Sequence, residues 1–259
     1  MDPMTLIGIG GAFLLLLVGV VMEGTNPAAL IGIPAFIIVI VPTVLVSAAG
    51  LTKADVSVVL GTAKRAMTGS IESAGDSIAL LVSFADTARK EGLLALEEPS
   101  RSIEDPFLKK GINLAVDGTD PAELSEILEA EIHSKKLEDK VAAKFFTDMG
   151  GFAPTLGIVG AVTGLIHVLG NLADPASAGQ GIAAAFVATF YGVAFANILF
   201  LPLANKIKRV SEAEAHRMEL LLEGILAIQA GANPRVVEQK LVAHLPPAER
   251  DQLPEPEAA

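Results

Sequence analysis

Four long apolar runs without a single Asp, Glu, Lys or Arg constrain this chain more than any other feature. They cover approximately residues 4–22, 28–48, 149–170 and 181–203. A helix needs about 20 apolar residues to cross the hydrocarbon core of a bilayer, and four uncharged runs of this length rarely coincide in a soluble domain. The sequence therefore predicts an all-α, polytopic membrane protein with four transmembrane helices in two hairpins and a helical cytoplasmic domain.

The first run has one alternative interpretation, a cleaved signal peptide. Residues 1–3 (MDP) lack the basic segment that opens a signal peptide, and no clear A-x-A cleavage site follows. A membrane span is therefore the favoured interpretation.

The basic residues predict the orientation of the spans. Twelve of the 19 Lys and Arg residues lie between Lys53 and Lys144, the other seven lie between Lys206 and Arg250, and the connectors 23–27 and 171–180 contain none. Segments rich in Lys and Arg remain on the cytoplasmic side of the membrane. We therefore expect both long polar segments and both termini in the cytoplasm.

Composition excludes several classes of function. The net charge is −11, whereas binding to nucleic acid relies on clustered Lys and Arg. Cysteine is absent, so neither a disulfide framework nor a thiolate metal site can form. No Walker loop, G-x-S-x-G elbow or H-E-x-x-H motif occurs. We therefore expect no enzyme, no metal site, no cofactor and no nucleic-acid partner.

The segment between the second and third runs is predicted to be helical. Residues 71–90 have an amphipathic pattern, and a break is expected at 98–100 (EPS). A second helix is expected from Asp105 to 117–118 (DG). Asp120 can cap a third helix, which meets no strong breaker before the third run and can form one long helix with it.

The fourth run continues into an amphipathic helix that is expected to stop at Gly231, and Asn233 precedes a short final helix. The chain is thus divided into five predicted parts. These are a first transmembrane hairpin (1–48), a cytoplasmic helical domain (49–148), a second transmembrane hairpin (149–203), cytoplasmic C-terminal helices (204–245) and a disordered acidic tail (246–259).

Small residues recur at helical spacing on the third and fourth runs. Such residues let helix backbones approach closely in lipid. For any one glycine, packing within the chain is the simpler interpretation, but two facing stripes favour a surface for an additional helix from a partner. The stripes include Gly157, Gly160 and Gly164 on the third run, and Ala185 and Gly192 on the fourth.

None of the four runs contains an acid that could carry an ion. A charge inside the membrane costs about 2.5–3.5 kcal/mol on insertion scales, so it is kept there only for function. His167, near the outer end of the third run, is interpreted as an interfacial or packing residue. If ions cross the membrane here, a partner must supply the carboxylate.

Several motifs give the chain a resemblance to the MotA/PomA family, the ring subunit of the bacterial flagellar stator. They are residues 88–98 (ARKEGLLALEE), 110–111 (KG) with 116–118 (VDG), 153–160 (APTLGIVG), and 189–192 (TFYG) with 200–204 (FLPLA). The resemblance covers all four spans and the cytoplasmic loop. Shorter three-span relatives that energise outer-membrane transport share the small-residue faces but lack the first hairpin.

The resemblance implies a rotor interface in the cytoplasmic domain. Arg89 and Glu97 match the family's charged pair that touches the switch-complex protein of the rotor, and Lys90 and Glu98 are the secondary candidates. Without the resemblance, the simpler interpretation of these four residues is a solvated helix face. Exposed charges of both signs provide orientation and register with little net affinity.

The resemblance also implies roles for residues of the third and fourth spans. Pro154 and Pro202 match two functional prolines, which can act as conformational hinges because proline removes a backbone donor. Thr189 matches a threonine near the ion path, and Thr155 lies nearby but out of register. Ala161 stands where sodium-type members have a second threonine, which favours protons because sodium needs several oxygen ligands.

The function that these matches imply is a proton-type stator subunit in the bacterial inner membrane. Five copies would surround two helices of a single-span, MotB-like or PomB-like partner, whose membrane aspartate binds the ion. Three alternatives stay open: a sodium-driven stator of the PomA type, a non-flagellar energising ring of the ExbB/TolQ type, and a passive scaffold without ion flux.

Overall fold

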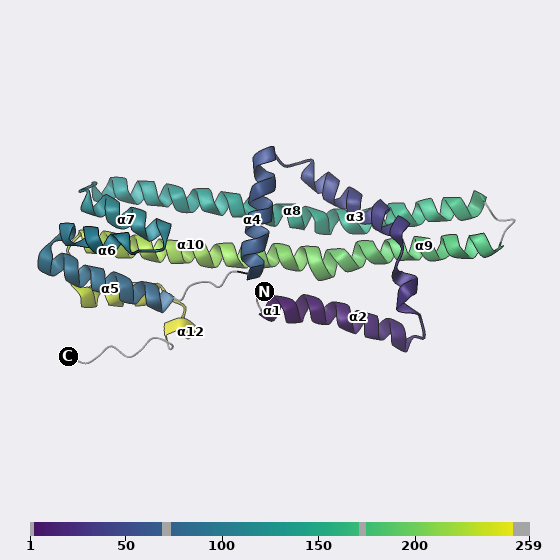
Figure 1. The fold of residues 1–259 in the computed structure, drawn as a ribbon, viewed down its shortest axis with the longest axis horizontal. Coiled ribbons are helices and arrows are strands. Elements are labelled where there is room, and N and C mark those ends of the chain that lie inside the picture. Colours follow the sequence, from purple (N-terminus) through teal and green to yellow (C-terminus); the bar gives the residue numbers. More distant parts are fainter. Residues whose placement is uncertain (1–2, 69–73, 171–174, 251–259) are drawn as a thin grey trace. The chain divides into compact units, whose positions relative to one another are not determined.

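The computed structural model describes residues 3–68, 74–170 and 175–250, which form helices and short turns with no strand among them (Figure 1). In chain order the helices are α1 (Pro3–Thr5), η1 (Leu6–Gly10), α2 (Gly11–Met22), η2 (Pro27–Leu30), α3 (Ile33–Ala48), α4 (Lys53–Thr68), α5 (Ala74–Glu91), η3 (Leu93–Leu96), α6 (Glu97–Arg101), α7 (Pro106–Val116), α8 (Pro121–Gly170), α9 (Pro175–Ala194), η4 (Phe195–Phe200), α10 (Leu201–Gln229), α11 (Pro234–His244) and α12 (Pro247–Arg250). The predicted all-α class is confirmed.

The helices form two compact units. The first unit comprises Met1–Ser70 and Glu138–Val210, and the second comprises Ile71–Leu137 and Ser211–Ala259. These units are groups of packed helices, so they do not test the predicted division of the chain into membrane and cytoplasmic parts, which stays a prediction.

Three helical stretches of the described chain are long and apolar enough to cross a membrane: Pro3–Met22, Pro121–Gly170 and Ala178–Gln229. A fourth results if α3 is counted together with α4, from which it is bent by 117°. By itself α3 has 16 residues and a length of about 24 Å, which is shorter than the roughly 30 Å of a bilayer core. Three to four candidate spans agree with the four that hydropathy predicts.

Most of the predicted helix ends occur where the sequence places them. Asp105 caps α7, because its Oδ1 accepts the backbone N–H groups of Phe107 and Leu108. Asp120 accepts the N–H of Ala122 at the start of α8, and Asn233 accepts the N–H of Arg235 at the start of α11. Helix α8 runs without interruption from the polar segment through the third apolar run, which confirms the predicted long helix.

The predicted break at residues 98–100 is wrong. Helix α5 ends earlier, at Glu91, because Gly92 adopts φ +88°, a conformation that favours glycine. Pro99 instead lies in the first turn of α6, where its missing N–H has no helical partner to lose. Helix α12 lies inside the segment expected to be disordered from 246, and residues 251–259 are outside the described part.

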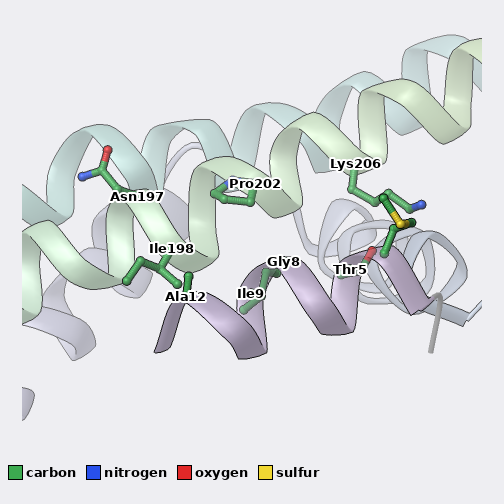
Figure 2. A pocket seen from close by; sticks show the side chains of 9 residues that line it. Thr5, Gly8, Ile9, Ala12, Asn197, Ile198, Pro202 and Lys206 are labelled. Atoms are coloured by element: carbon green, nitrogen blue, oxygen red, sulfur yellow. The ribbon is translucent and has the colours of Figure 1, made fainter. Parts of the chain in front are cut away.

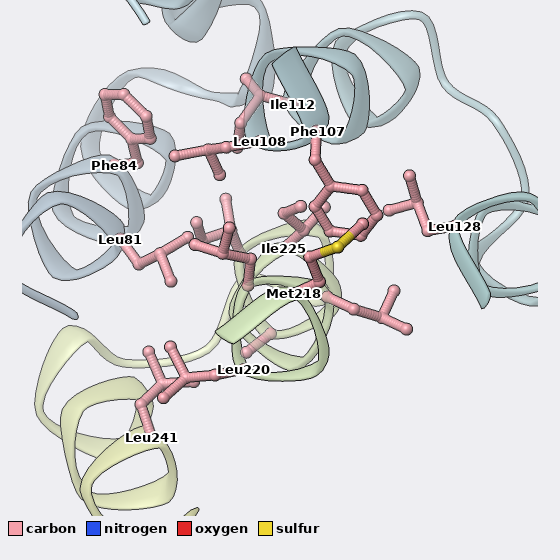
Figure 3. Packing of buried hydrophobic residues seen from close by; sticks show 14 of the residues in the cluster. Leu81, Phe84, Phe107, Leu108, Ile112, Leu128, Met218, Leu220, Ile225 and Leu241 are labelled. Atoms are coloured by element: carbon pink, nitrogen blue, oxygen red, sulfur yellow. The ribbon is translucent and has the colours of Figure 1, made fainter. Parts of the chain in front are cut away.

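The core of the second unit is an apolar cluster drawn from α5, α7, α8, α10 and α11 (Figure 3). Leu81, Ile112, Leu128, Ile225 and Leu241, one from each helix, are completely buried. Burial of a side chain of this size stabilises the fold by about 1.5–3 kcal/mol. The predicted amphipathic face of α5 is therefore confirmed for the residues that the structure describes, and residues 71–73 of that prediction lie outside them.

Ion pairs hold the same helices from their polar sides. Arg217 of α10 donates through Nη1 to Asp105 Oδ2 over 2.5 Å, and both side chains are largely buried. The Asp105 carboxylate thus caps α7 and binds α10 with its two different oxygens. Lys136 of α8 pairs with Glu219 of α10 over 2.7 Å. This unit is consequently a firm support for the segments at its surface.

Within the first unit, α8 and α9 approach through glycines. A Cβ atom built on Gly192 would lie 2.4 Å from the backbone oxygen of Ala153, and one on Gly157 would lie 3.0 Å from the backbone oxygen of Ala188. Backbone atoms cannot move aside as a flexible side chain can. Gly157 and Gly192 therefore set the distance between the two helices.

The other small residues of the two stripes are part of the same intramolecular contact. A Cβ on Gly160 would lie 2.8 Å from the Cβ of Ala188 and 3.3 Å from Ile38, and one on Gly164 would lie 3.1 Å from the Cβ of Ala185. Contacts with α9 and α3 thus cover Gly157, Gly160, Gly164, Ala185 and Gly192 within the chain. That these residues also pack against a partner helix stays a prediction.

Tyr191 of α9 joins the second hairpin to the first. The chain is not helical between η2 and α3, and the Tyr191 hydroxyl donates to the carbonyl of Leu30 over 2.6 Å and accepts the N–H of Gly32 over 3.1 Å. A broken helix in an apolar environment needs other partners for its freed backbone groups. One side chain thus satisfies both sides of this break.

A buried carboxylate that the sequence did not single out fixes α4 to α8. Asp139 is 2% exposed and accepts from Arg65 Nη2 over 2.5 Å. Thr62, one turn away on α4, adds a longer hydrogen bond of 3.4 Å to the same oxygen. Asp139 continues the apolar face that contains Ile132 and Ala142, and an acid at such a position is the pattern that could have revealed the pair.

We predict that Gly192→Ala destabilises the protein by about 1–3 kcal/mol, because the new Cβ forces the α8 and α9 backbones apart. Gly151→Ala on α8 is the matched control, since nothing lies within 4 Å of its Cβ position and alanine favours a helix. Thermal unfolding of the detergent-purified chain measures both variants. Equal midpoints for the two variants would contradict the proposed role of Gly192.

We predict that Tyr191→Phe also destabilises the protein, by about 1–3 kcal/mol, because the carbonyl of Leu30 and the N–H of Gly32 both lose their partner. Thr163→Val is the control, since the Thr163 hydroxyl only bonds the carbonyl of Val159 in its own helix. The same unfolding measurement applies, and an unchanged midpoint for Tyr191→Phe would show that water replaces the hydroxyl.

Candidate functional site

The two predicted hinge prolines lie in different backbone environments. Pro154 is half-buried inside α8, which continues through it as an α-helix. Pro202 is the second residue of α10, which directly follows η4, a π-helical stretch. Proline removes one helical hydrogen bond and crowds the preceding turn, and a widened turn relieves that crowding. The departure from α-helical geometry is therefore found at Pro202, and the hinge role of both prolines stays a prediction.

The predicted ion-path residues are only partly brought together. Thr189 is half-buried at the contact between α8 and α9, where its Cα would lie 3.3 Å from a Cβ on Gly157. Ala161 is one helical turn from Gly157 and is also half-buried, whereas Thr155 is exposed. Residues two apart on a helix point to nearly opposite sides, so Thr155 lies on a different face of α8 from Gly157.

The hydroxyl groups of these threonines are held by their own helices. Thr189 donates to the carbonyl of Ala185 over 3.3 Å, and Thr155 donates to that of Phe152 over 2.8 Å. A hydroxyl that donates its hydrogen keeps oxygen lone pairs that can accept. Both threonines can therefore accept a hydrogen bond from a hydrated proton or from a protonated acid without breaking the helix.

An exposed aliphatic stripe on α8 is the feature that sequence reasoning missed. Val159, Val162, Ile166 and Leu169 are between 50% and 68% exposed, and Thr155 belongs to the same row. Their spacing alternates between four and three residues, which is the repeat of a seam between two packed helices. This repeat is visible in the sequence, but the nearby glycines give a more obvious signal. The stripe is therefore a face of α8 that another helix can reach.

The four predicted charged residues lie at the surface of the second unit. Arg89 and Lys90 are in the last turn of α5, Glu97 and Glu98 are in the first turn of α6, and all four are exposed. Lys90 pairs with Asp86 over 2.6 Å and Glu97 pairs with Arg101 over 3.1 Å, both within their own helices. Exposed pairs of this kind contribute little stability, so another charged surface can exchange with them.

Arg89 and Glu98 have no ion-pair partner among the described residues. The segment between the two charged turns is anchored from below, because Leu96 is completely buried and Leu93 packs on the core of the second unit. The site thus presents two basic and two acidic side chains from a fixed turn. The arrangement suits recognition of a protein surface that carries both signs of charge.

Comparison with known proteins gives the same assignment for the whole chain. Residues 99–220 match the model of the MotA/TolQ/ExbB proton channel family. The chain is 37% identical to motility protein A of Bacillus subtilis over 256 residues, which is 96% of this chain and 93% of that protein. The alignment therefore includes both hairpins and the helices between them.

Two solved structures share the fold. The structure of MotAB from C. jejuni has a TM-score of 0.91 at 34% identity, and covers 95% of this chain and 97% of that one. The flagellar MotAB stator complex from Bacillus subtilis has a TM-score of 0.88 at 35% identity, with coverage of 96% and 99%. Similarity of this extent in sequence and in fold shows that the chain belongs to the MotA/TolQ/ExbB proton channel family, as a relative of motility protein A.

Proposed function

We propose that this chain is the ring-forming subunit of an ion-driven flagellar stator, which couples ion flow across the membrane to torque on the rotor. One observation carries the proposal. The likeness to the MotAB structures extends over at least 95% of the chain and includes the first hairpin, at a TM-score of 0.91. Five copies would surround two single-span helices of a MotB-like partner.

The partner helix would contact the aliphatic stripe of α8. This stripe is exposed and has the spacing of a helix-packing seam, whereas the glycine stripes are already covered by the chain. None of the four apolar runs contains an acid, so the membrane aspartate of the partner would bind and release the ion. The chain would supply the surrounding wall and the moving head, and would catalyse no chemical reaction.

The ion is proposed to be a proton. Ala161 stands where sodium-type relatives carry a threonine, and it lies on the same side of α8 as Gly157, which faces Thr189. Loss of one hydroxyl removes a ligand that sodium would need, whereas a proton needs only a chain of acceptors. No resident cofactor is proposed.

The proposed location is the bacterial inner membrane, with both termini in the cytoplasm. The support is the distribution of the 19 Lys and Arg residues, all of which lie in the two long polar segments. This orientation places Arg89, Lys90, Glu97 and Glu98 in the cytoplasm, where the switch complex of the rotor would meet them.

A non-flagellar energising ring is the second candidate function. The matched family includes TolQ and ExbB, and such a ring would use the same membrane helices. The first hairpin favours the stator, because shorter three-span relatives lack it. A passive scaffold is the third candidate, and it differs from both rings because it would conduct no ions.

We predict that exchanging Arg89 and Glu97 for alanine greatly reduces swimming while the ring still assembles. The two side chains are exposed and contribute little to folding, so their loss removes only contacts to the rotor. Swimming in soft agar measures motility, and co-purification with the partner measures assembly.

The control for this experiment is Glu126→Ala, which removes an exposed charge from α8 of the same unit. Swimming that is unchanged by the double exchange would favour the energising ring. A scaffold would be indicated by co-expressed complexes that leave the pH response of cell growth unaltered.

We predict that swimming speed at fixed pH is independent of sodium concentration. Ala161→Thr restores the hydroxyl found in sodium-type relatives. We expect the swimming speed of this variant either to stay independent of sodium or to show a partial response to sodium. A strong dependence of the wild-type speed on sodium would overturn the proton assignment while leaving the stator assignment intact.

A further inference from the structure

A groove of about 490 Å³ lies between the first helical stretch and the fourth span of the first unit (Figure 2). Gly8, Ile9 and Ala12 form one wall, and Ile198 and Pro202 form much of the other. The volume is within the range of pockets that hold small ligands. We propose that this groove binds an anionic glycerophospholipid of the membrane, with an acyl chain between the walls and the phosphate at Lys206.

The groove begins at the charged edge of the membrane and leads into its apolar layer. Lys206 is the first charged residue after the fourth apolar run, and Thr5, near the start of the first run, lies at the same end of the groove (Figure 2). Ala12 is eight residues after Met4, and Ile198 is eight residues before Lys206; eight residues of helix span about 12 Å. A molecule in the groove therefore needs a polar end and an apolar tail in this order.

Charge selects the kind of polar end. Among the described residues that line the groove, Lys206 is the only charged one. An ammonium has three N–H donors, so it can hold a phosphate oxygen beside another partner. Basic residues at the cytoplasmic ends of membrane helices bind anionic lipid head groups in this way. A free phosphate would satisfy the ammonium but leave the apolar walls in contact with water.

The walls of the groove depart from regular helix geometry. Gly8 and Ile9 belong to η1 (Leu6–Gly10), and Asn197 and Ile198 belong to η4, so a π-helical stretch lies on each side. Short π-helical stretches occur frequently at functional sites. Gly8 has no atom within 4 Å of its Cβ position, so the space beside it is open.

A helix from a second copy of the chain is the main competing occupant. The apolar runs of a second copy contain no Asp or Glu, so such a helix would offer no anionic group at the Lys206 end of the groove. A phospholipid offers an anionic group together with an apolar tail, and the inference does not depend on the proposed stator function.

The test uses the full-length chain in nanodiscs that contain phosphatidylglycerol or phosphatidylcholine with identical acyl chains and a photoreactive group in the tail. We expect labelling of residues 4–12 and 197–206, about fivefold stronger with phosphatidylglycerol, since one basic residue contributes about this factor near an anionic head group. Equal labelling by the two lipids would overturn the proposal.

Matched variants separate the head group from the tail. Lys206→Gln should abolish the preference for phosphatidylglycerol, whereas Lys208→Gln, an exposed neighbour outside the groove, should keep it. Gly8→Leu should fill the groove and reduce labelling with both lipids, whereas Gly19→Leu, on the same stretch and equally open, should not. Labelling that Gly8→Leu leaves unchanged would show that the tail is not in the groove.

Cysteine chemistry detects the competing occupant. The chain contains no cysteine, so Ala12→Cys introduces a single thiol at the inner end of the groove. We expect this variant to remain monomeric in oxidative cross-linking when a second copy carries one cysteine on an exposed position of α8. A disulfide between the copies would place a neighbouring subunit in the groove and overturn the lipid assignment.

Discussion

The close approach of the α8 and α9 backbones determines how the membrane part of this protein is built. In lipid, apolar burial provides little drive for helix association, so contact depends on van der Waals packing at short range. Gly157 and Gly192 permit that range because backbone atoms of the other helix occupy the positions where a Cβ would be. The same contact holds Thr189 against Gly157, and an exposed face of α8 is left for another helix. A subunit that forms a ring around a partner needs two such faces on α8, one that packs within its own chain and one that packs against other chains.

The second unit achieves rigidity by different means. Its core contains completely buried side chains from five helices, and Asp105 connects α7 to α10 through Arg217. The four charged residues of the candidate rotor interface lie in the last turn of α5 and the first turn of α6, where Gly92 follows the end of α5 and the buried Leu96 anchors the segment. Force applied to these side chains would reach the whole unit because the turn cannot yield independently of the core.

Much of the fold could be predicted from the sequence because the strongest signals are local. Uncharged runs predict spans, and Asp105, Asp120 and Asn233 mark helix starts through hydrogen bonds that extend only two or three residues. The errors concern features that depend on distant contacts. The contacts that the glycine stripes make with α3 and α9 could not be specified, because the sequence cannot say which helix covers a small-residue face. The buried Asp139 and the π-helical stretches depend on packing, and Pro99 misled because proline is as acceptable in a first helical turn as in a break.

The hydroxyl that bridges Leu30 and Gly32 belongs to the only tyrosine of the chain, which also has no tryptophan. Phe36 and Phe195 surround the Tyr191 ring in edge-on contacts, with centroids 6.3 and 5.8 Å away. Tyrosine emission from the purified chain therefore originates at one point, the junction of its two hairpins. The protein carries its own optical reporter for separation of the hairpins, and no label has to be introduced to observe it.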